Sequence, residues 1–349
     1  MKPLIKIKDK YIGTQKPVYI IAEMSANHNQ NFDKAVNIIK AAERTGADAI
    51  KLQTYTPDTL TIDCDRDEFK IKGSLWKGKN LYNLYKEAYT PWEWHPRLKA
   101  IAEDMGLDFF STPFDETAVD FLSNMDIPAF KVASFEIVDL PLLRKIAQTG
   151  KPIIMSTGMA TLAEIDEAVY TIREAGNDNI ALLKCTSAYP ALPEEMDLKT
   201  IPHLGRAFGV PCGVSDHTMG IAVPVAAVAL GACIVEKHLT LSRSEQGPDS
   251  AFSLEPDEFK TMVDAIRTTE KAIGHVRYGR TEKEKKSRSF RRSLFVVQDM
   301  KTGDKFTPEN VRSIRPGFGL HTRYIEKILG RTASSEISKG TPLSWKIVR

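Results

Sequence analysis

Side chains that can do chemistry recur in this sequence at the ends of short apolar runs. In chain order they are Glu23, Lys51, Gln53, Thr112, Lys131, Ser134, Ser156, Ser187, Tyr189, Ser215, His217, Glu236 and His238. Lysine is rarely buried without a partner, so two strands ending in lysine, at Lys51 and Lys131, indicate a site for phosphate or carboxylate. Solvent-facing lysines at ragged strand ends are the alternative, which weakens if both lie on the same face.

His217 and His238 end the last two apolar runs. Neighbouring parallel strands lie about 4.8 Å apart, so two imidazoles at one level can reach a single cation. Glu236 precedes His238 by two residues and faces the same side, and this set suits a divalent cation such as manganese. Ordinary hydrogen bonding of the histidines is the alternative. Asp249, in the following loop, would act as acid or base or orient a hydroxyl, unless it is a plain loop aspartate.

Eight apolar runs are the strand candidates that position these residues. They are Val18–Ala22, Ala49–Leu52, Leu107–Ser111, Ala129–Val132, Pro152–Met155, Ile180–Lys184, Val210–Val214 and Ala232–Val235. Between them, residues 35–42 carry an i, i+3, i+4, i+7 apolar stripe, and Thr161 with Glu164 has capping-box spacing. Alternating strands and helices predict a (β/α)8 TIM barrel with its site at the carboxyl ends of the strands. An open doubly wound sheet is the alternative, but no GxGxxG follows the first run.

Composition marks the domain boundaries. We predict a catalytic barrel over residues 1–276, a charged linker over 277–292 and a small turn-rich domain over 293–349. Residues 56–95, rich in tyrosine and tryptophan, interrupt the alternation of predicted strands and helices between the second and third apolar runs. An enlarged loop there would cover the substrate, because it lies on the catalytic face of a barrel; a simple surface excursion is the alternative.

Charge and composition exclude several classes of protein. No apolar run approaches the roughly 20 residues that cross a bilayer, so no membrane partner is expected. Residues 276–349 carry 18 Lys and Arg against 7 Asp and Glu, a net +11, which leaves −8 for residues 1–275 in a chain of net +3. This basic end lacks nucleic-acid motifs, so no nucleic acid is expected either. Met1 to Lys10 show no export signal and the four cysteines lack CxxC spacing, so we expect a cytoplasmic protein with reduced, packed thiols.

Eight strings in a fixed order resemble the sialic acid synthase family. They are IAEMSANHNQN, ADAIKLQTY, STPFD, FKVASFE, IIMSTGMAT, CTSAYP, GVSDHTMG and IVEKHLTL. The basic end, with SIRPGFGL, resembles the antifreeze-like (SAF) domain of these enzymes, so the resemblance covers nearly the whole chain. KLQTYTPDTLT and the segment from Gly73 to His95 look most like the pseudaminic acid synthase branch, since neuraminate synthases usually have KFQ where this chain has Lys51-Leu52-Gln53.

The resemblance implies a metal-dependent synthase that condenses phosphoenolpyruvate, an acetamido sugar and water by C–O cleavage. The pseudaminic branch implies 2,4-diacetamido-2,4,6-trideoxy-L-altrose as the sugar; a synthase of N-acetylneuraminate or N,N'-diacetyllegionaminate is the alternative. The residues that would hold phosphoenolpyruvate are Lys51, Lys131, Thr112, Ser134, Ser156, Ser215 and also Ser187, where neuraminate synthases commonly have Asn. Those that would surround the sugar are Glu23, Gln53, Tyr189, Glu236 and Asp249. His217 and His238 would ligate Mn2+, with Mg2+ or Co2+ as substitutes.

Family members are domain-swapped homodimers, so Arg315 in SIRPGFG is expected to reach into the partner subunit's barrel. Two other hypotheses stay open at this point. The tail could be a carbohydrate- or ice-binding module on an idle barrel, although the intact set of site residues argues against idleness. A keto-deoxy sugar phosphate synthase on the same barrel would need a site for a distal phosphate and would leave the SAF-like tail unexplained.

Overall fold

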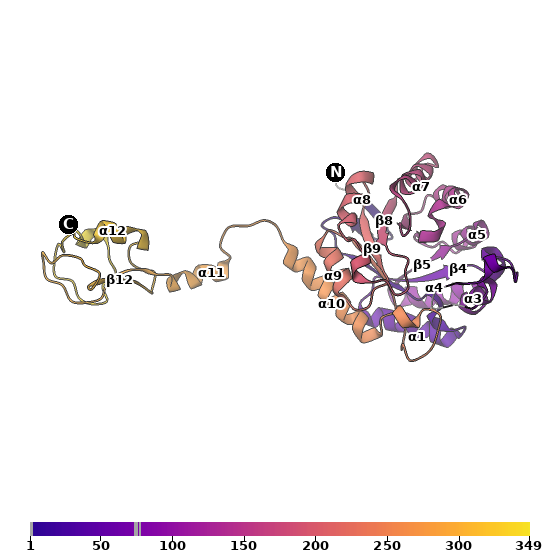
Figure 1. The fold of residues 1–349 in the computed structure, drawn as a ribbon, viewed down its shortest axis with the longest axis horizontal. Coiled ribbons are helices and arrows are strands. Elements are labelled where there is room, and N and C mark those ends of the chain that lie inside the picture. Colours follow the sequence, from indigo (N-terminus) through magenta and orange to yellow (C-terminus); the bar gives the residue numbers. More distant parts are fainter. Residues whose placement is uncertain (1–2, 73–75, 77) are drawn as a thin grey trace. The chain divides into compact units, whose positions relative to one another are not determined.

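Eight parallel strands close into a barrel in the first of two units of this computed structural model (Figure 1). The units are Met1–Gly274 and His275–Arg349, and the structure describes residues 3–72, 76 and 78–349. Around the barrel the order is β10-β3-β4-β5-β6-β7-β8-β9. The strands are β3 Tyr19–Glu23, β4 Ala49–Thr54, β5 Asp108–Pro113, β6 Phe130–Val132, β7 Ile153–Ser156, β8 Ile180–Cys185, β9 Cys212–Asp216 and β10 Ile234–His238. The predicted TIM barrel is confirmed.

Helices follow the strands and surround the barrel (Figure 1). They are α1 Phe32–Thr45, α4 His95–Asp104, α5 Glu116–Asn124, α6 Leu140–Gln148, α7 Leu162–Glu174, α8 Thr200–Phe208, α9 Ala222–Ala229 and α10 Pro256–Ile273. Two signals read from the sequence act as predicted. α1 ends at Gly46, whose positive φ of 81° lets its N–H bond back to the Ala42 carbonyl. α7 begins with the reciprocal capping box of Thr161 and Glu164.

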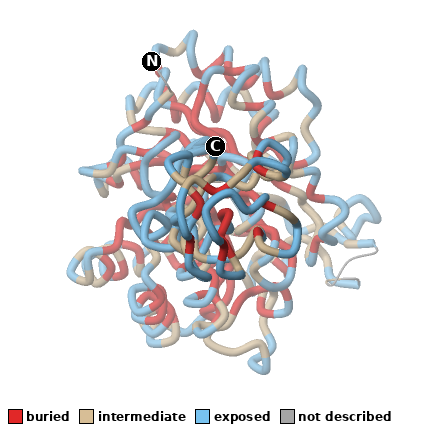
Figure 2. Tube along the Cα trace, turned by 90° about the vertical axis from the view of Figure 1, so that its left-hand side faces the viewer, coloured by how far each residue is buried: buried red, intermediate tan, exposed pale blue. Residues whose placement is uncertain are grey.

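Short 3-10 helices occupy several of the loops. They are η1 Ser25–His28, η4 Ser134–Val138, η5 Pro193–Glu195 and η6 Ser250–Phe252, all at the carboxyl ends of strands. In the tube of Figure 2, many buried segments lie in the interior of the first unit, and many of the outer turns are exposed. The barrel core is therefore built as the apolar patterning requires, with its strands covered on both faces.

The strands run one to three residues further toward their carboxyl ends than the apolar runs suggested, except at β6. Glu23, Ser156 and His238 are the last residues of their strands rather than the residues that follow them. The parallel ladder continues through them, for example by pairing His238 with Glu23 across β10 and β3. The apolar pattern of each run ends at the residues that face the site, whereas the backbone pairing of the strands continues through those residues.

An N-terminal hairpin and the long insertion complete the first unit. The hairpin pairs β1 Leu4–Ile7 with β2 Lys10–Gly13 and buries Ile5, Ile7 and Ile12. The insertion after β4 contains α2 Pro57–Leu60, η2 Asp67–Phe69, α3 Leu81–Ala88 and η3 Trp92–Trp94. Its far end is fixed to the barrel by buried polar contacts of His28 with Thr90 (3.0 Å) and of Thr54 with His95 (2.9 Å).

The second unit has a hydrophobic core of its own. Its elements are α11 Glu282–Ser287, η7 Arg288–Phe290, β11 Ser293–Val296, β12 Val311–Ile314, η8 Thr322–Tyr324, α12 Ile325–Ile328 and η9 Trp345–Ile347. β11 and β12 pair antiparallel, and Leu294, Val296 and Phe306 are among the buried residues. The stretch that composition marked as a linker holds the short exposed helix α11, because Thr281 and Glu284 form a capping box there. Among the described residues, no helix has the length and apolar character that a membrane crossing requires.

Candidate active site

A buried cavity of about 50 Å³ lies at the carboxyl ends of the barrel strands, and all eight strands contribute to it. Its lining residues are Glu23, Lys51, Gln53, Thr112, Lys131, Ala133, Ser134, Ser156, Cys185, Tyr189, Ser215, His217, Glu236 and His238. Twelve of the fifteen residues singled out in the sequence are in this set. Both lysines and both histidines face the same cavity, so the alternative of lysines exposed at ragged strand ends is wrong.

Three predicted residues lie outside the lining set. The buried Asp249 carboxylate accepts hydrogen bonds from the Ser25 hydroxyl and, at 3.4 Å, from the Ala26 N–H, so it is held by the first βα loop. The Ser187 hydroxyl lies 3.9 Å from the thiol of Cys185, which does line the cavity. Arg315 follows β12 in the second unit and is therefore not part of the barrel.

The two lysines form an ionic cluster with two glutamates. Lys51 is paired with Glu23, donates to the Thr112 hydroxyl at 3.1 Å and lies 3.8 Å from the Glu236 carboxylate. Lys131 lies 3.9 Å from the same carboxylate. All of these ionisable side chains are at least 90% excluded from solvent. A buried ion pair is weak support for stability, so a functional role for the cluster is favoured instead.

Serine and threonine hydroxyls surround the two ammonium groups. Lys131 donates to the Ser156 hydroxyl at 2.7 Å and to the Val132 carbonyl at 2.8 Å. The Ser134 hydroxyl accepts from the N–H of Gly158 at 3.1 Å, and Ser134 lines the same cavity as Lys131. Hydroxyl and ammonium donors around one small cavity can bind the oxygens of a phosphate or carboxylate.

The pKa values of the two glutamates are shifted in opposite directions. Burial raises the pKa of Glu23, an effect that the charge of Lys51 only partly opposes. At Glu236, burial also acts to raise the pKa, but Lys131, Lys51 and His217 outweigh it and the pKa is lowered. Burial lowers the pKa of Lys131. The cavity thus combines a carboxyl group that holds its proton more tightly with a carboxylate that stays charged.

The two histidines meet at one side of this cavity. Their ring centroids are 5.4 Å apart, and Phe252 packs edge-on against both. The Nδ1 of His217 is 3.0 Å from the Thr186 carbonyl, to which it donates its hydrogen. The lone pair of the other ring nitrogen, Nε2, is then free. The buried Nδ1 of His238 has no hydrogen-bond partner, and burial together with His217 lowers the pKa of His238 far below its usual value.

These features fit a divalent cation. An unprotonated imidazole nitrogen is such a ligand, and His238, whose pKa is lowered, offers a buried Nδ1 that would otherwise be costly to leave unpartnered. Burial acts to lower the pKa of His217, but Cys185 and the Thr186 carbonyl raise it, so His217 would give up a proton when a cation binds. The Oε2 of Glu236 is also buried without a partner. Among the described residues no three His, Cys, Asp or Glu side chains form a complete ligand set, so water or substrate oxygens would have to complete the coordination.

Aromatic side chains close the cavity on the histidine side. Tyr189 packs on His217 with centroids 4.5 Å apart and on Phe252 at 5.1 Å. From the insertion, Trp76 contacts Tyr189 at 5.9 Å and donates to the Pro248 carbonyl at 3.1 Å. The insertion thus reaches a cavity residue, Tyr189, through Trp76, whereas residues 73–75 and 77 lie outside the described residues.

Comparison with known proteins decides the family. The NeuB family model matches residues 38–278, and the SAF domain model matches residues 291–349. The chain belongs to the NeuB family.

Its relatives include the pseudaminic acid synthase of Campylobacter jejuni, 48% identical over 95% of this chain and 96% of that protein. The pseudaminic acid synthase of Helicobacter pylori is 45% identical over 94% and 97% of the two chains. Among solved structures, the N-acetylneuraminic acid synthetase of Leptospira borgpetersenii superposes with a TM-score of 0.73 at 32% identity, covering 82% of this chain and 95% of that one.

One lining residue of this NeuB chain was assigned to the core by its sequence. Cys185 is buried at the end of β8 and also lines the cavity, with its thiol 3.9 Å from the Nδ1 of His217. Burial acts to raise the pKa of this thiol, but His217 and neighbouring groups lower it to about 7. The apolar residues around Cys185 in the sequence favoured a core assignment. Its position at the end of a predicted strand was the signal that could have identified it as a cavity residue.

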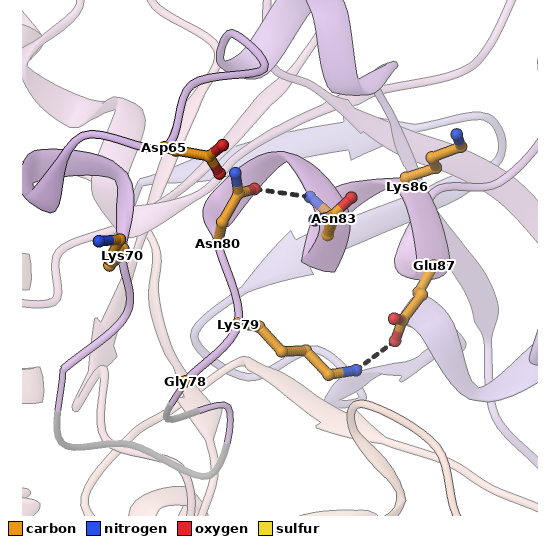
Figure 3. Close-up of a pocket in the computed structure, with 8 residues that line it drawn as sticks. All are labelled: Asp65, Lys70, Gly78, Lys79, Asn80, Asn83, Lys86 and Glu87. Carbon is orange, nitrogen blue, oxygen red and sulfur yellow. Dashed lines mark hydrogen bonds and ion pairs between the residues drawn. The ribbon is translucent and has the colours of Figure 1, made fainter.

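A larger pocket, of about 640 Å³, lies on the insertion away from these residues (Figure 3). Three lysines, an aspartate and a glutamate are among the residues that line it, and Lys79 is already paired with Glu87 across it. None of the cavity residues named above lines it. Size is therefore a poor guide to the chemistry in this chain.

Proposed function

We propose that this chain is a pseudaminic acid synthase. It would condense phosphoenolpyruvate with 2,4-diacetamido-2,4,6-trideoxy-L-altrose and water, and release pseudaminic acid and phosphate. The observation that carries the proposal is the convergence of Lys51, Lys131, His217 and His238 on one cavity in a NeuB-family chain. Its 48% identity to a pseudaminic acid synthase supports this sugar.

In this proposal the lysine side of the cavity binds phosphoenolpyruvate. Lys51 and Lys131 neutralise its phosphate and carboxylate, and the hydroxyls of Thr112, Ser134, Ser156 and Ser215 donate to the same oxygens. Ser187 is not among the lining residues and would approach the phosphate from beside Cys185.

His217 and His238 would hold a divalent cation, Mn2+ with Mg2+ or Co2+ as substitutes; imidazole favours Mn2+ over the harder Mg2+, and the oxygen ligands that would complete the site also suit Mn2+. When bound, such a cation polarises the aldehyde of the open-chain sugar as a Lewis acid. Gln53, Tyr189, Glu236 and Asp249 would orient the sugar hydroxyl and acetamido groups.

In the reaction, the C3–C2 π electrons of phosphoenolpyruvate form the new bond to C1 of the aldehyde, whose oxygen becomes a hydroxyl by gaining a proton. The positive charge left at C2 is stabilised by the nearby Glu23 and Glu236 carboxyl groups. Water adds to C2 and loses a proton, which we assign to Glu23. The C2–O bond to phosphate then breaks, and the hydroxyl left on C2 becomes the ketone by giving its proton to the departing phosphate. Lys51 and Lys131 stabilise the charge of that phosphate.

We also propose a domain-swapped homodimer in which Arg315 completes the partner subunit's site. Among the described residues no arginine lines the cavity, although a sugar-and-anion site commonly uses one. Near Arg315, Phe318 is 71% exposed. Exposed apolar side chains also follow strands β6 to β9 beside the cavity, at Phe135, Val138, Met159, Leu162, Leu192 and Met219. The −8 and +11 charges of the two parts favour their association.

We infer a cytoplasmic location from the four cysteines, all of which are free thiols.

The test is a sugar competition with the full chain, Mn2+ and phosphoenolpyruvate, measured as phosphate release. We expect the trideoxy-L-altrose to be turned over in preference to N-acetylmannosamine and to the legionaminic acid precursor. Preference for N-acetylmannosamine would assign the chain to the neuraminate branch instead, an alternative that the 32% identical Leptospira structure keeps open. No turnover of any sugar would refute the synthase itself.

A further inference from the structure

A buried ion pair joins the two strands that end in the histidines. Asp216 and Lys237 are register partners on β9 and β10, and both side chains have 0% exposure. They point away from the cavity, because Ser215 and Glu236, one residue earlier on each strand, line it. The chemistry described above uses neither of them.

The pair also fixes the turn that follows His217. The Oδ1 of Asp216 accepts from the N–H of Thr218 at 2.9 Å and from its hydroxyl at 2.8 Å. The ammonium group of Lys237 donates to the Thr218 carbonyl at 2.6 Å. The residues on both sides of His217 are thus bonded to the residue that precedes His238.

Stability alone is a poor reason for this arrangement. Two charges removed from water cost free energy that an apolar pair of the same size would not, and buried ion pairs are often replaced without loss of stability. A network of directional hydrogen bonds is better suited to fixing the positions of neighbouring side chains. Metal ligands must be held to within about 0.5 Å, and groups that orient ligands typically account for about 10–100-fold in metal affinity.

We propose that the Asp216–Lys237 pair is a positioning device that sets the separation of His217 and His238 for one divalent cation. The inference rests on the proposed function, in which these histidines bind the metal. With the pair intact, β9 and β10 present the two rings as one unit. Without it, the turn at Thr218 loses its hydrogen bond from Lys237 and its link to β10, and the rings move independently.

The test measures Mn2+ affinity directly, by calorimetry and by the electron paramagnetic resonance spectrum of bound Mn2+. The main variant is the double replacement Asp216→Asn with Lys237→Met, which leaves no unpaired buried charge and keeps an acceptor for Thr218. We expect Mn2+ to bind about 10–100-fold more weakly and with a broadened spectrum. Affinity for phosphoenolpyruvate without metal should change less than about threefold, because Lys51 and Lys131 lie on other strands.

The matched control is Ile234→Val, which removes one buried methyl group from the same strand. It should lower the melting temperature and leave the Mn2+ affinity unchanged. A double variant that binds Mn2+ as tightly as the unchanged protein, or that does not fold, would refute the positioning role. If the unchanged protein itself bound no Mn2+, the metal step of the proposed function would fail instead.

Discussion

At the scale of single residues, Glu23 and Glu236 show how two carboxyl groups in one cavity differ in protonation because their surroundings differ. Both carboxyl groups are buried beside the same lysines. Burial dominates at Glu23 and raises its pKa, whereas the cations dominate at Glu236 and lower its pKa. A proton can therefore be taken up at Glu23 while Glu236 remains charged, which is the division of labour that acid–base chemistry needs.

The first prediction concerns Glu23→Gln, which keeps the shape of the side chain but cannot accept a proton. We expect kcat/KM to fall about 10²–10⁴-fold, the usual contribution of a positioned base. In the unchanged enzyme, activity should rise with pH through the raised pKa of Glu23, above the ordinary carboxyl value of about 4.3. The pH–rate profile of the variant should lack this acidic limb. A variant with an unaltered limb would remove Glu23 from proton transfer.

The second prediction concerns the histidine pair. His217→Ala and His238→Ala should each abolish Mn2+-dependent turnover, since the described residues offer no third ligand to compensate. The melting temperature without metal should change little. His203→Ala, on the exposed face of α8, is the matched control and should behave like the unchanged protein. Normal rates in both site variants would show that the metal, if used, binds elsewhere.

At the scale of elements, the loop after β7 depends on a glycine. A Cβ added at Gly158 would collide with the Ser187 hydroxyl and lie 2.7 Å from the hydroxyl of Ser134. The N–H of Gly158 already donates to the Ser134 hydroxyl at 3.1 Å. Lack of a side chain at this position is what lets two βα loops close around the proposed phosphate site.

The third prediction is therefore that Gly158→Ala raises the KM for phosphoenolpyruvate about tenfold. Overpacking of this kind costs about 1–3 kcal/mol, and about 1.4 kcal/mol corresponds to a factor of ten. The KM for the sugar should change less. Gly205→Ala, in helix α8, meets no atom closer than 3.6 Å and serves as the control, with both KM values unchanged. An equal rise of both KM values in Gly158→Ala would contradict the local effect.

Elements were also where the sequence was most informative. Apolar runs placed all eight barrel strands, because strands covered on both faces must be continuously hydrophobic. The same criterion ended the strands too early, since Glu23 and His238 keep the ladder while turning polar toward the cavity. Cys185 and the Asp216–Lys237 pair were not recognised, because apolar patterning does not give the register that brings their side chains against those of the neighbouring strand.

At the scale of the whole molecule, each of the two units has its own core, and the residues that line the cavity all belong to the first. The basic second unit would otherwise contribute nothing to a reaction that consumes an anionic substrate. Arg315 lies in that unit next to the exposed Phe318, so the dimer is where the charge asymmetry of the sequence would become functional. Sequence composition revealed the asymmetry but could not say which subunit's cavity the arginine serves.

Complementation between two inactive subunits answers that question. Lys131→Ala removes a cavity lysine, and Arg315→Ala removes the cation of the second unit. In a swapped dimer made of one subunit of each kind, one cavity combines an intact Lys131 with the partner's intact Arg315, and the other contains both lesions. Heterodimers purified by two different tags should therefore recover about half of the unchanged activity, one site of two, while each parent homodimer stays nearly inactive. If Arg315 instead served its own barrel, every site would carry one lesion and the heterodimer would be no more active than its parents.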